Sequence, residues 1–511
     1  AAVFVIGGNI ESSENINGRF QTIENRTTFF AKMACLLAGR YIAQCCGRQS
    51  ACIYSSRRQQ TYAACARTQT ATVESYCGSK PPVIPIFRQV PQFTDRVALR
   101  DRHGDYTYRG LFLSSRQFAG EITNSLEGKR QERVAFLCPN DASYLIVQWA
   151  CWMSGQIVVP MAQDHPTPIH DLYIKHSEAG LVVTTSEYAH SLQNLANKNG
   201  AKLLVIDDAL RVLAMRPSAK STLLPPQPAP SPWNEDEQLE AGLEPQFYNE
   251  SDAMIIYTSG TTGTPKGVVV THSNIQAQIS SLVKAWGWNE KDVVLHTLPL
   301  HHIHGIVNVL MCPLVVGGRC VMLPKFEPSR VWSQLLAINM PASERINVFM
   351  AVPTIYMKLV EEYEHIFTKN QRMQEYIRSV CSQKIRLMVS GSSPLPTPLF
   401  EKWEKITGHK LLERYGMTET GMVLSNPLHG ERKPGFVGTP LPGVEVQIAK
   451  NLLNQDHEVL VQGSETQGTT TLSTKYTSGE LRVKGPNIFK GYWKDPKATK
   501  KEFTSDGWFK T

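Results

Sequence analysis

The sequence predicts an α/β protein in which two doubly wound, mostly parallel sheets are followed by a small β-rich unit. Short apolar runs alternate with helical patterns from about residue 84 to residue 434. Strands separated by helices are typical of parallel sheets. From residue 435 onward the sequence becomes rich in Gly, Pro, Val and Thr, which favours short strands and tight turns. The length of 511 residues suits about three units of ordinary domain size.

The first α/β segment covers residues 84–250. Expected strands are 134–137, 156–160, 181–185 and 202–206, and a helix is expected over 142–155. Residues 217–232 contain six prolines, so we expect a stiff solvated loop between this segment and the next.

The second α/β segment begins at residue 253. Its expected strands are 254–257, 293–296, 320–323, 348–351 and 386–389, and its clearest helical patterns are 273–286 and 354–363. The apolar stretch 306–316 is interrupted by Asn308 and Pro313 and is shorter than a membrane span, so we expect a buried element. In the β-rich unit, strands are expected within 438–448, 479–483 and 487–492, while the polar residues 451–477 are expected to be a loop insertion.

The N-terminal residues differ in composition from the rest. Residues 33–80 begin at Met33 and are rich in Arg, Ser, Ala and Gln, with five Arg and no acid before residue 74. This composition predicts a mitochondrial transit segment, so we expect a location in the mitochondrial matrix. A solvated basic tail is the alternative. Residues 1–32 carry no pattern that we can interpret, and both segments are set aside from the fold.

Charge and cysteine content restrict the classes of function. The net charge is +8, but the acid-free N-terminal segment carries most of it, and no basic cluster is interleaved with aromatic residues. We therefore expect no nucleic-acid partner and no transmembrane segment. Six of the 11 cysteines lie at or before Cys77, and the other five are scattered, which suggests reduced thiols rather than disulfides or metal ligands.

One loop has the chemistry of a phosphate site. Residues 257–267 read YTSGTTGTPKG, with three glycines, five hydroxyls and Lys266. Glycines let backbone N–H groups turn toward an anion, hydroxyls donate further hydrogen bonds, and the lysine adds positive charge. Pro265 stands where a Walker loop needs its second glycine. The residues that follow are β-branched, so the loop is expected to join two strands.

This loop and three later motifs resemble the adenylate-forming, AMP-binding superfamily of acyl-CoA synthetases. The later motifs are LPLHHIHG at 298–305, VSGSSPLP at 389–396 with ERYGMTETG at 413–421, and GELRVKGPNIFKGYW at 479–493. The resemblance covers residues 84–511 and implies the large N-terminal domain of these enzymes. It implies AMP-binding α/β subdomains over 84–434 and a β-rich subdomain over 435–511. The C-terminal catalytic lysine domain of the family is expected to be absent from this chain.

The resemblance also implies roles for individual residues, with ATP, Mg²⁺ and coenzyme A as cofactors. Catalytic roles fall to Thr418 at the α-phosphate, Glu419 as the Mg²⁺ ligand, Lys266 and His302. ATP would be bound by Thr258, Ser259, Gly260, Thr261, Thr262, Gly263, Thr264 and Lys266 in the loop, and by Gly391, Ser392, Ser393, Pro394, Tyr415, Gly416, Met417 and Thr418 in the adenine and metal segment. A hard cation such as Mg²⁺ favours a carboxylate ligand.

The acid substrate is predicted from Arg386, which lies on a short apolar strand. With a period of two it shares a face with Ser390. A buried guanidinium needs an anionic partner, and its fork matches a carboxylate. His302 and His304 could add donors. The free carboxylate of malonate would be such a partner, and the alternative partner is a structural acid of the protein itself.

We therefore expect an ATP-dependent acid–thiol ligase that forms an acyl-adenylate and then an acyl-CoA, with malonate as the favoured acid. The sequence around 386–392 and 411–420 resembles the mitochondrial malonyl-CoA synthetases of the superfamily. A medium-chain or fatty acyl-CoA synthetase is one alternative, and it predicts an apolar pocket without Arg. An adenylation domain of a peptide synthetase is a weaker alternative. A nucleotide-binding fragment without turnover is the alternative outside enzyme function.

Overall fold

The computed structural model describes residues 3–5, 82–216, 241–258, 265–337, 339–451, 457–476 and 478–511. Of the N-terminal residues 1–80, only the backbone of Val3–Val5 is described, so the transit-segment prediction lies outside the described residues. The same holds for the whole proline-rich segment 217–232 and for residues 259–264 of the phosphate loop.

A seven-stranded sheet forms the first α/β layer system, in the order β21-β9-β8-β5-β4-β6-β7. Strands β8, β5, β4, β6 and β7 run parallel to one another. Strand β9 pairs antiparallel with β8, and β21 pairs antiparallel with β9. The bounds are β4 Arg133–Leu137, β5 Ile157–Pro160, β6 Leu181–Thr184, β7 Lys202–Val205, β8 Asp252–Thr258, β9 Lys266–Thr271 and β21 Gly491–Tyr492. The predicted strands of this segment are confirmed, and residues 257–267 do join two strands.

A nine-stranded sheet forms the second system, in the order β16-β15-β14-β13-β12-β10-β11-β2-β3. Its central strands from β2 to β14 are parallel, and β3, β15 and β16 are antiparallel at the two edges. The bounds are β2 Val97–Arg100, β3 Asp105–Thr107, β10 Val293–His296, β11 Arg319–Met322, β12 Val348–Ala351, β13 Leu387–Ser390, β14 Leu412–Met417, β15 Gly421–Ser425 and β16 Thr439–Pro440.

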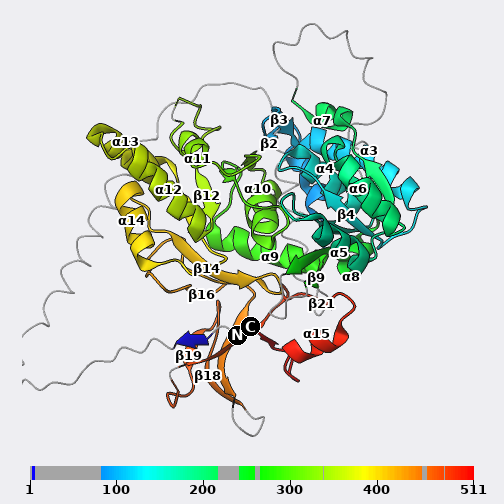
Figure 1. Cartoon of the computed structure of the whole chain (residues 1–511). Coiled ribbons are helices and arrows are strands. Elements are labelled where there is room, and N and C mark those ends of the chain that lie inside the picture. Colours follow the sequence, from blue (N-terminus) through cyan, green and yellow to red (C-terminus); the bar gives the residue numbers. More distant parts are fainter. Residues whose placement is uncertain are drawn as a thin grey trace, which may run out of the picture. The chain divides into compact units, whose positions relative to one another are not determined.

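Helices connect and cover the two sheets, and helices α11 to α14 lie together beside the nine-stranded sheet (Figure 1). The helix bounds are η1 Ile86–Gln92, α3 Tyr108–Ser125, α4 Ala142–Met153, α5 Thr167–Ser177, α6 Ser186–Lys198, α7 Asp208–Ala214, α8 Pro245–Glu250, α9 His272–Trp286, η3 His304–Met311, α10 Cys312–Val315, α11 Pro328–Leu335, α12 Pro353–Ile366, α13 Gln371–Lys384, α14 Thr397–Thr407 and α15 Pro496–Glu502. The predicted buried element over 306–316 is real, and most of it is a π-helix, η3.

The central strands of the seven-stranded sheet, β4, β5, β6 and β8, are buried on both faces, as the doubly wound prediction requires. Along β4, Val134 and Phe136 enter one apolar cluster, while Ala135 and Leu137 enter a second. Successive side chains of a strand point to opposite faces, so each cluster covers one face. This explains why these strands are apolar throughout instead of alternating with polar residues.

The β-rich unit is a six-stranded sheet with the path β1-β20-β17-β18-β19, and β22 pairs with β20. The bounds are β1 Val3–Val5, β17 Glu445–Asn451, β18 His457–Ser464, β19 Gly468–Thr471, β20 Ser478–Lys484 and β22 Phe509–Lys510. The prediction that 451–477 is a loop insertion was therefore wrong, because most of it forms the β18–β19 hairpin. Every residue of β19 is exposed, so this edge strand carries no apolar pattern that could have revealed it.

A search of the described residues for membrane spans finds no helix with the length and apolar character to cross a bilayer.

Candidate active site

Lys266 is placed by the β8–β9 hairpin. It begins β9 and pairs across the hairpin with Thr258, the last residue of β8. The two strands thus hold both ends of the phosphate loop at one position. Residues 259–264 lie outside the described residues, so the predicted contributions of their hydroxyls and glycines stay predictions.

Glu419 lies in the turn between β14 and β15 and is buried. Its carboxylate accepts a hydrogen bond from the Tyr492 hydroxyl at 2.9 Å. The Lys266 ammonium lies 4.7 Å from the centre of the same Tyr492 ring. Burial raises the pKa of Glu419, while the hydrogen bond from Tyr492 and the charge of Lys266 lower it. The phosphate-loop lysine and the predicted metal ligand, 153 residues apart in sequence, are therefore neighbours around one tyrosine.

The segment that ends in β21 holds these two sites together. The N–H of Phe489 donates to the carbonyl of Glu419 at 2.8 Å, and the Asn487 side chain donates to the carbonyl of Thr420 at 2.6 Å. A few residues on, β21 pairs with β9 just beyond Lys266. This segment therefore contacts the metal segment and the phosphate hairpin at once, which fixes the distance between them.

A second cluster lies at the carboxyl end of β13, on the other side of β14. The Arg414 guanidinium donates to the Ser392 hydroxyl at 3.4 Å, and that hydroxyl is 3.2 Å from His304 Nδ1. Gly391 makes this approach possible, since a Cβ atom there would lie 2.4 Å from the guanidinium carbon. Ser392 has a φ of 69°, and strained backbone of this kind gathers at functional sites.

Arg414 is buried and forms no ion pair with any described residue. Its Nε atom has no hydrogen-bond partner there, and burial lowers the pKa of Arg414 to about 9. The adjacent Glu413 does not compensate the charge, because neighbouring residues on a strand point to opposite faces. Instead, Glu413 accepts from the N–H of Gly435 at 3.2 Å. An unpaired buried guanidinium is costly, so this one is suited to an anionic ligand.

His304 completes a polar site around Arg414. Burial and the nearby Arg414 charge hold the pKa of His304 well below its usual value, so the ring is neutral. When the Ser392 hydroxyl donates to Nδ1, the proton of the neutral ring lies on Nε2. Nε2 is buried without a partner among the described residues. His304 can therefore donate one further hydrogen bond to a ligand.

Arg386, predicted to hold the substrate, is paired in the structure with an acid of the protein. Its guanidinium makes two bonds of 2.6 Å to the carboxylate of Asp292 and donates to the carbonyl of Trp286 at 2.9 Å. Arg386 also precedes β13, so it lies at the amino end of the strand, whereas ligands of parallel sheets bind beyond the carboxyl ends. A four-residue strand separates the two ends by roughly 13 Å. The structural acid considered as the alternative partner is Asp292.

The other predicted residues lie on the same elements. Ser390 ends β13, and its hydroxyl is buried without a partner among the described residues. His302 precedes η3 and is exposed, with its ring 4.1 Å from that of His301. Tyr415, Gly416 and Met417 complete β14 and are half-buried, as is Thr418 in the turn after it, while Ser393 and Pro394 are exposed after β13.

A small cavity of about 10 Å³ lies beside Thr418. It is lined by Ile303 and Val307 of the η3 region and by Ile275 and Gln278 of α9. The capping box of Thr271 and Asn274 starts α9 and thereby sets where Gln278 falls. Gln278 in turn accepts from the N–H of Met422 at 2.6 Å. The space next to the predicted α-phosphate residue is therefore small.

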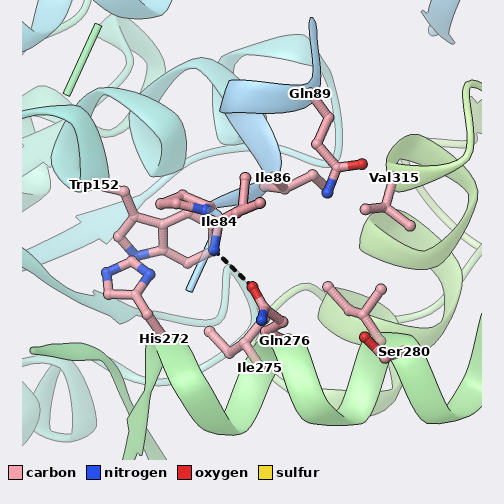
Figure 2. Close-up of a pocket in the computed structure, with 11 residues that line it drawn as sticks. Ile84, Ile86, Gln89, Trp152, His272, Ile275, Gln276, Ser280 and Val315 are labelled. Atoms are coloured by element: carbon pink, nitrogen blue, oxygen red, sulfur yellow. Dashed lines mark hydrogen bonds between the residues drawn. The ribbon is translucent and has the colours of Figure 1, made fainter. Parts of the chain in front are cut away.

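A larger cavity of about 200 Å³ lies between η1, α4, α9 and α10 (Figure 2). Ile84, Ile275 and Val315 contribute apolar surface, and Trp152 and His272 lie together at one side. None of the predicted site residues lines it. This cavity is separate from the cluster around Arg414.

Sequence reasoning missed Arg414 and Tyr492 as site residues, and it missed Glu502 as a neighbour of Lys266. Arg414 lies inside the quoted motif ERYGMTETG, and the argument applied to Arg386 applies to it equally well. Tyr492 stands in the motif GYW, but nothing in the sequence shows that its hydroxyl reaches Glu419. Glu502, whose carboxylate is 3.8 Å from the Lys266 ammonium, had no local signal at all.

Comparison with known proteins agrees with this arrangement. The model of the family described as AMP-binding enzyme matches residues 86–493. The chain belongs to the AMP-binding enzyme family. Among its relatives is the human mitochondrial malonate–CoA ligase ACSF3, which is 46% identical over 435 residues, covering 84% of this chain and 71% of that protein.

Solved structures of AMP-binding enzymes have the same fold. ATP-bound MatB from Rhodopseudomonas palustris matches with a TM-score of 0.66 at 29% identity, over 83% of this chain and 75% of that one. A malonyl-CoA ligase with methylmalonyl-CoA and AMP bound matches with a TM-score of 0.61 at 27% identity, over 84% of this chain and 77% of that one.

Proposed function

We propose that this AMP-binding enzyme joins malonate to coenzyme A at the expense of ATP, giving malonyl-CoA, AMP and pyrophosphate. A malonate oxygen attacks the α-phosphorus and pyrophosphate leaves. The CoA sulfur then attacks the carbonyl carbon of malonyl-adenylate and AMP leaves. The observation that carries the proposal is the buried Arg414, which has no ion-pair partner in the described part of the chain. Together with His304 and Ser392 it forms a site for a second carboxylate.

The two carboxylates of malonate bind to different parts of the site in this proposal. Arg414 and the Nε2 proton of His304 hold the distal carboxylate of malonate. The other carboxylate, one carbon away, then lies toward Thr418, which follows four residues after Arg414 through β14 and its turn. Because each carboxylate has its own set of donors, malonate binds in one orientation, with one end presented for reaction.

Glu419 and Lys266 serve the nucleotide in this proposal. Glu419 fits a Mg²⁺ ligand, because it is a buried carboxylate that accepts one side-chain hydrogen bond, from the Tyr492 hydroxyl, within the described part of the chain. Mg²⁺ is usually held by one or two carboxylates together with substrate phosphates, and when bound it neutralises phosphate charge. Lys266, with residues 258–264, holds the phosphates. Tyr415 and the backbone of residues 391–394 contact the adenine, while the Ser392 hydroxyl stays with Arg414 and His304.

The charge of the site argues against the fatty acyl-CoA synthetase alternative. A long acyl chain beside Arg414 would cover a buried guanidinium without neutralising it, which is costly. A short dicarboxylate instead brings a carboxylate that can pair with this guanidinium.

Pyrophosphate release with malonate, butyrate and octanoate tests this function. The assay uses the chain itself and a version joined to the part of the human relative that follows the aligned region. We expect release with malonate to exceed release with either monocarboxylate. Glu419→Gln should abolish release with every acid, because a neutral amide is a poor Mg²⁺ ligand. A preference for octanoate would instead favour the alternative function, that of a fatty acyl-CoA synthetase.

We also propose a location in the mitochondrial matrix, from the acid-free, Arg-rich composition of residues 33–80. A fusion of residues 33–80 to a fluorescent protein should be imported and shortened by isolated mitochondria in a manner that depends on the membrane potential. A control fusion with the five Arg of this segment changed to Gln should remain outside. Import of both fusions to the same extent would count against the transit segment.

A further inference from the structure

The ammonium of Lys266 is already engaged by an acid of the protein. Its Nζ atom lies 3.8 Å from Glu502 Oε1, while Tyr492 lies under it. About a quarter of the Lys266 side chain and 30% of the Glu502 side chain are exposed, so the pair is shielded from solvent only in part. A surface pair of this kind is worth little to stability. Its position beside the proposed phosphate site suggests another role.

The fold holds Glu502 at this place. Helix α15 (red in Figure 1) is capped by Asp495, whose side chain accepts from the N–H of Ala498, and ends at Glu502. The next residue, Phe503, stacks on Phe489 with ring centres 5.9 Å apart. Phe489 is also bonded to the backbone of Glu419. The last residue of α15 is thereby fixed next to the segment that carries the proposed metal ligand.

Glu502 also acts electrostatically on the cluster. Burial is the main cause of the raised pKa of Glu419, and the charge of Glu502 raises it further. The pKa of Tyr492 is raised by burial, by Glu419 and by Glu502. Two carboxylates, Glu419 and Glu502, therefore act on one ammonium, that of Lys266.

We propose that Glu502 is a positioning residue that holds the Lys266 ammonium while no nucleotide is bound and yields it to the triphosphate, so that it sets the affinity for Mg·ATP. This inference rests on the proposed ATP-dependent function. A triphosphate carries more negative charge than one carboxylate, so it displaces Glu502 from Lys266. Glu502 then lies near the phosphates and repels them, which keeps nucleotide binding weaker than the site would otherwise allow.

Equilibrium binding of Mg·ATP to the whole chain, measured by calorimetry, tests this inference. Glu502→Gln keeps the shape of the side chain and removes its charge, and we expect the Kd for Mg·ATP to fall about threefold to fivefold, the range of a partly exposed ion pair. In turnover assays the KM for ATP should fall by the same factor while kcat and the KM for malonate stay unchanged. The matched control is Glu465→Gln, which removes the 2.7 Å pair with Lys284 elsewhere and should leave the Kd unchanged.

Measuring the effect of Glu502→Gln a second time, in a Lys266→Met variant, distinguishes an effect that acts through Lys266 from a general effect of charge. In Lys266→Met, which has no ammonium to release, the gain from Glu502→Gln should shrink. An equal gain in affinity for Mg·ATP with and without Lys266 overturns the proposed role of Glu502. An unchanged or higher Kd for Mg·ATP in Glu502→Gln alone overturns it as well. If the unaltered chain binds no Mg·ATP, the proposed function fails, and that result is distinct from both.

Discussion

Replacing Arg414 by alanine is expected to lower kcat/KM for malonate by about 30-fold or more. Removing one partner of a buried, hydrogen-bonded charge pair costs about 2–5 kcal/mol, and each 1.4 kcal/mol is a factor of ten. The loss should be confined to acids with a second carboxylate. Butyrate has no charge for Arg414 to hold, so its low rate should change little or rise. Pyrophosphate release at subsaturating malonate and butyrate measures both effects.

Two comparison variants show that the loss reflects recognition of the carboxylate. Arg414→Lys keeps a positive charge but lacks the planar fork, so its activity with malonate should lie between those of the parent and Arg414→Ala. Arg386→Ala changes the other arginine considered for this role. It should retain the preference for malonate over butyrate in whatever fraction folds.

The specificity of the loss is a readout that a merely structural role would not give. A structural defect lowers activity with every acid, whereas a lost carboxylate partner lowers activity with malonate alone. Equal losses on malonate and butyrate in Arg414→Ala would contradict this assignment.

The fold could be predicted from the sequence wherever burial leaves a pattern. Strands β10 and β12 fall on the predicted residues 293–296 and 348–351, because strands buried on both faces read as short continuous apolar runs. The β18–β19 hairpin was missed for the opposite reason. An edge strand such as β19, exposed along its whole length, is stabilised by backbone pairing and turn geometry, and these leave no periodicity in the side chains.

Site residues could be predicted from the sequence where they lie in a recognisable motif. They could not be predicted where the role of a residue depends on a partner that is distant in the sequence. The sequence shows Arg386 and Arg414 as similar residues, each on a short strand near a glycine-rich segment. What separates them is Asp292, which lies 94 residues before Arg386 and takes up its charge. No comparable acid lies beside Arg414 in the described part of the chain. The principle that a buried guanidinium needs an anion is sound, but the fold decides which anion each arginine receives.

Replacing Arg386 by alanine is therefore expected to destabilise the fold by about 3 kcal/mol, the lower end of the range for breaking a buried pair. Asp292 is fully buried, whereas about a quarter of the Arg386 side chain is exposed, so the removed arginine leaves a buried carboxylate behind. Asn289 and Asn347 still donate to that carboxylate, which limits the cost. The guanidinium also lies over the Trp288 ring at 5.6 Å, and this contact is lost with it.

Denaturant unfolding of the parent, Arg386→Ala, Asp292→Asn and the double variant measures this pair directly. The double variant has no buried charge left without its partner, so its loss of stability should be smaller than the sum of the two single losses. If Arg386→Ala does not fold well enough to be measured, Arg386→Lys should fold with an intermediate loss, because lysine keeps the charge but cannot make both bonds to Asp292. An Arg386→Ala variant as stable as the parent would show that the pair with Asp292 is not structural. If that stable variant also failed on malonate while retaining butyrate, the substrate role would return from Arg414 to Arg386.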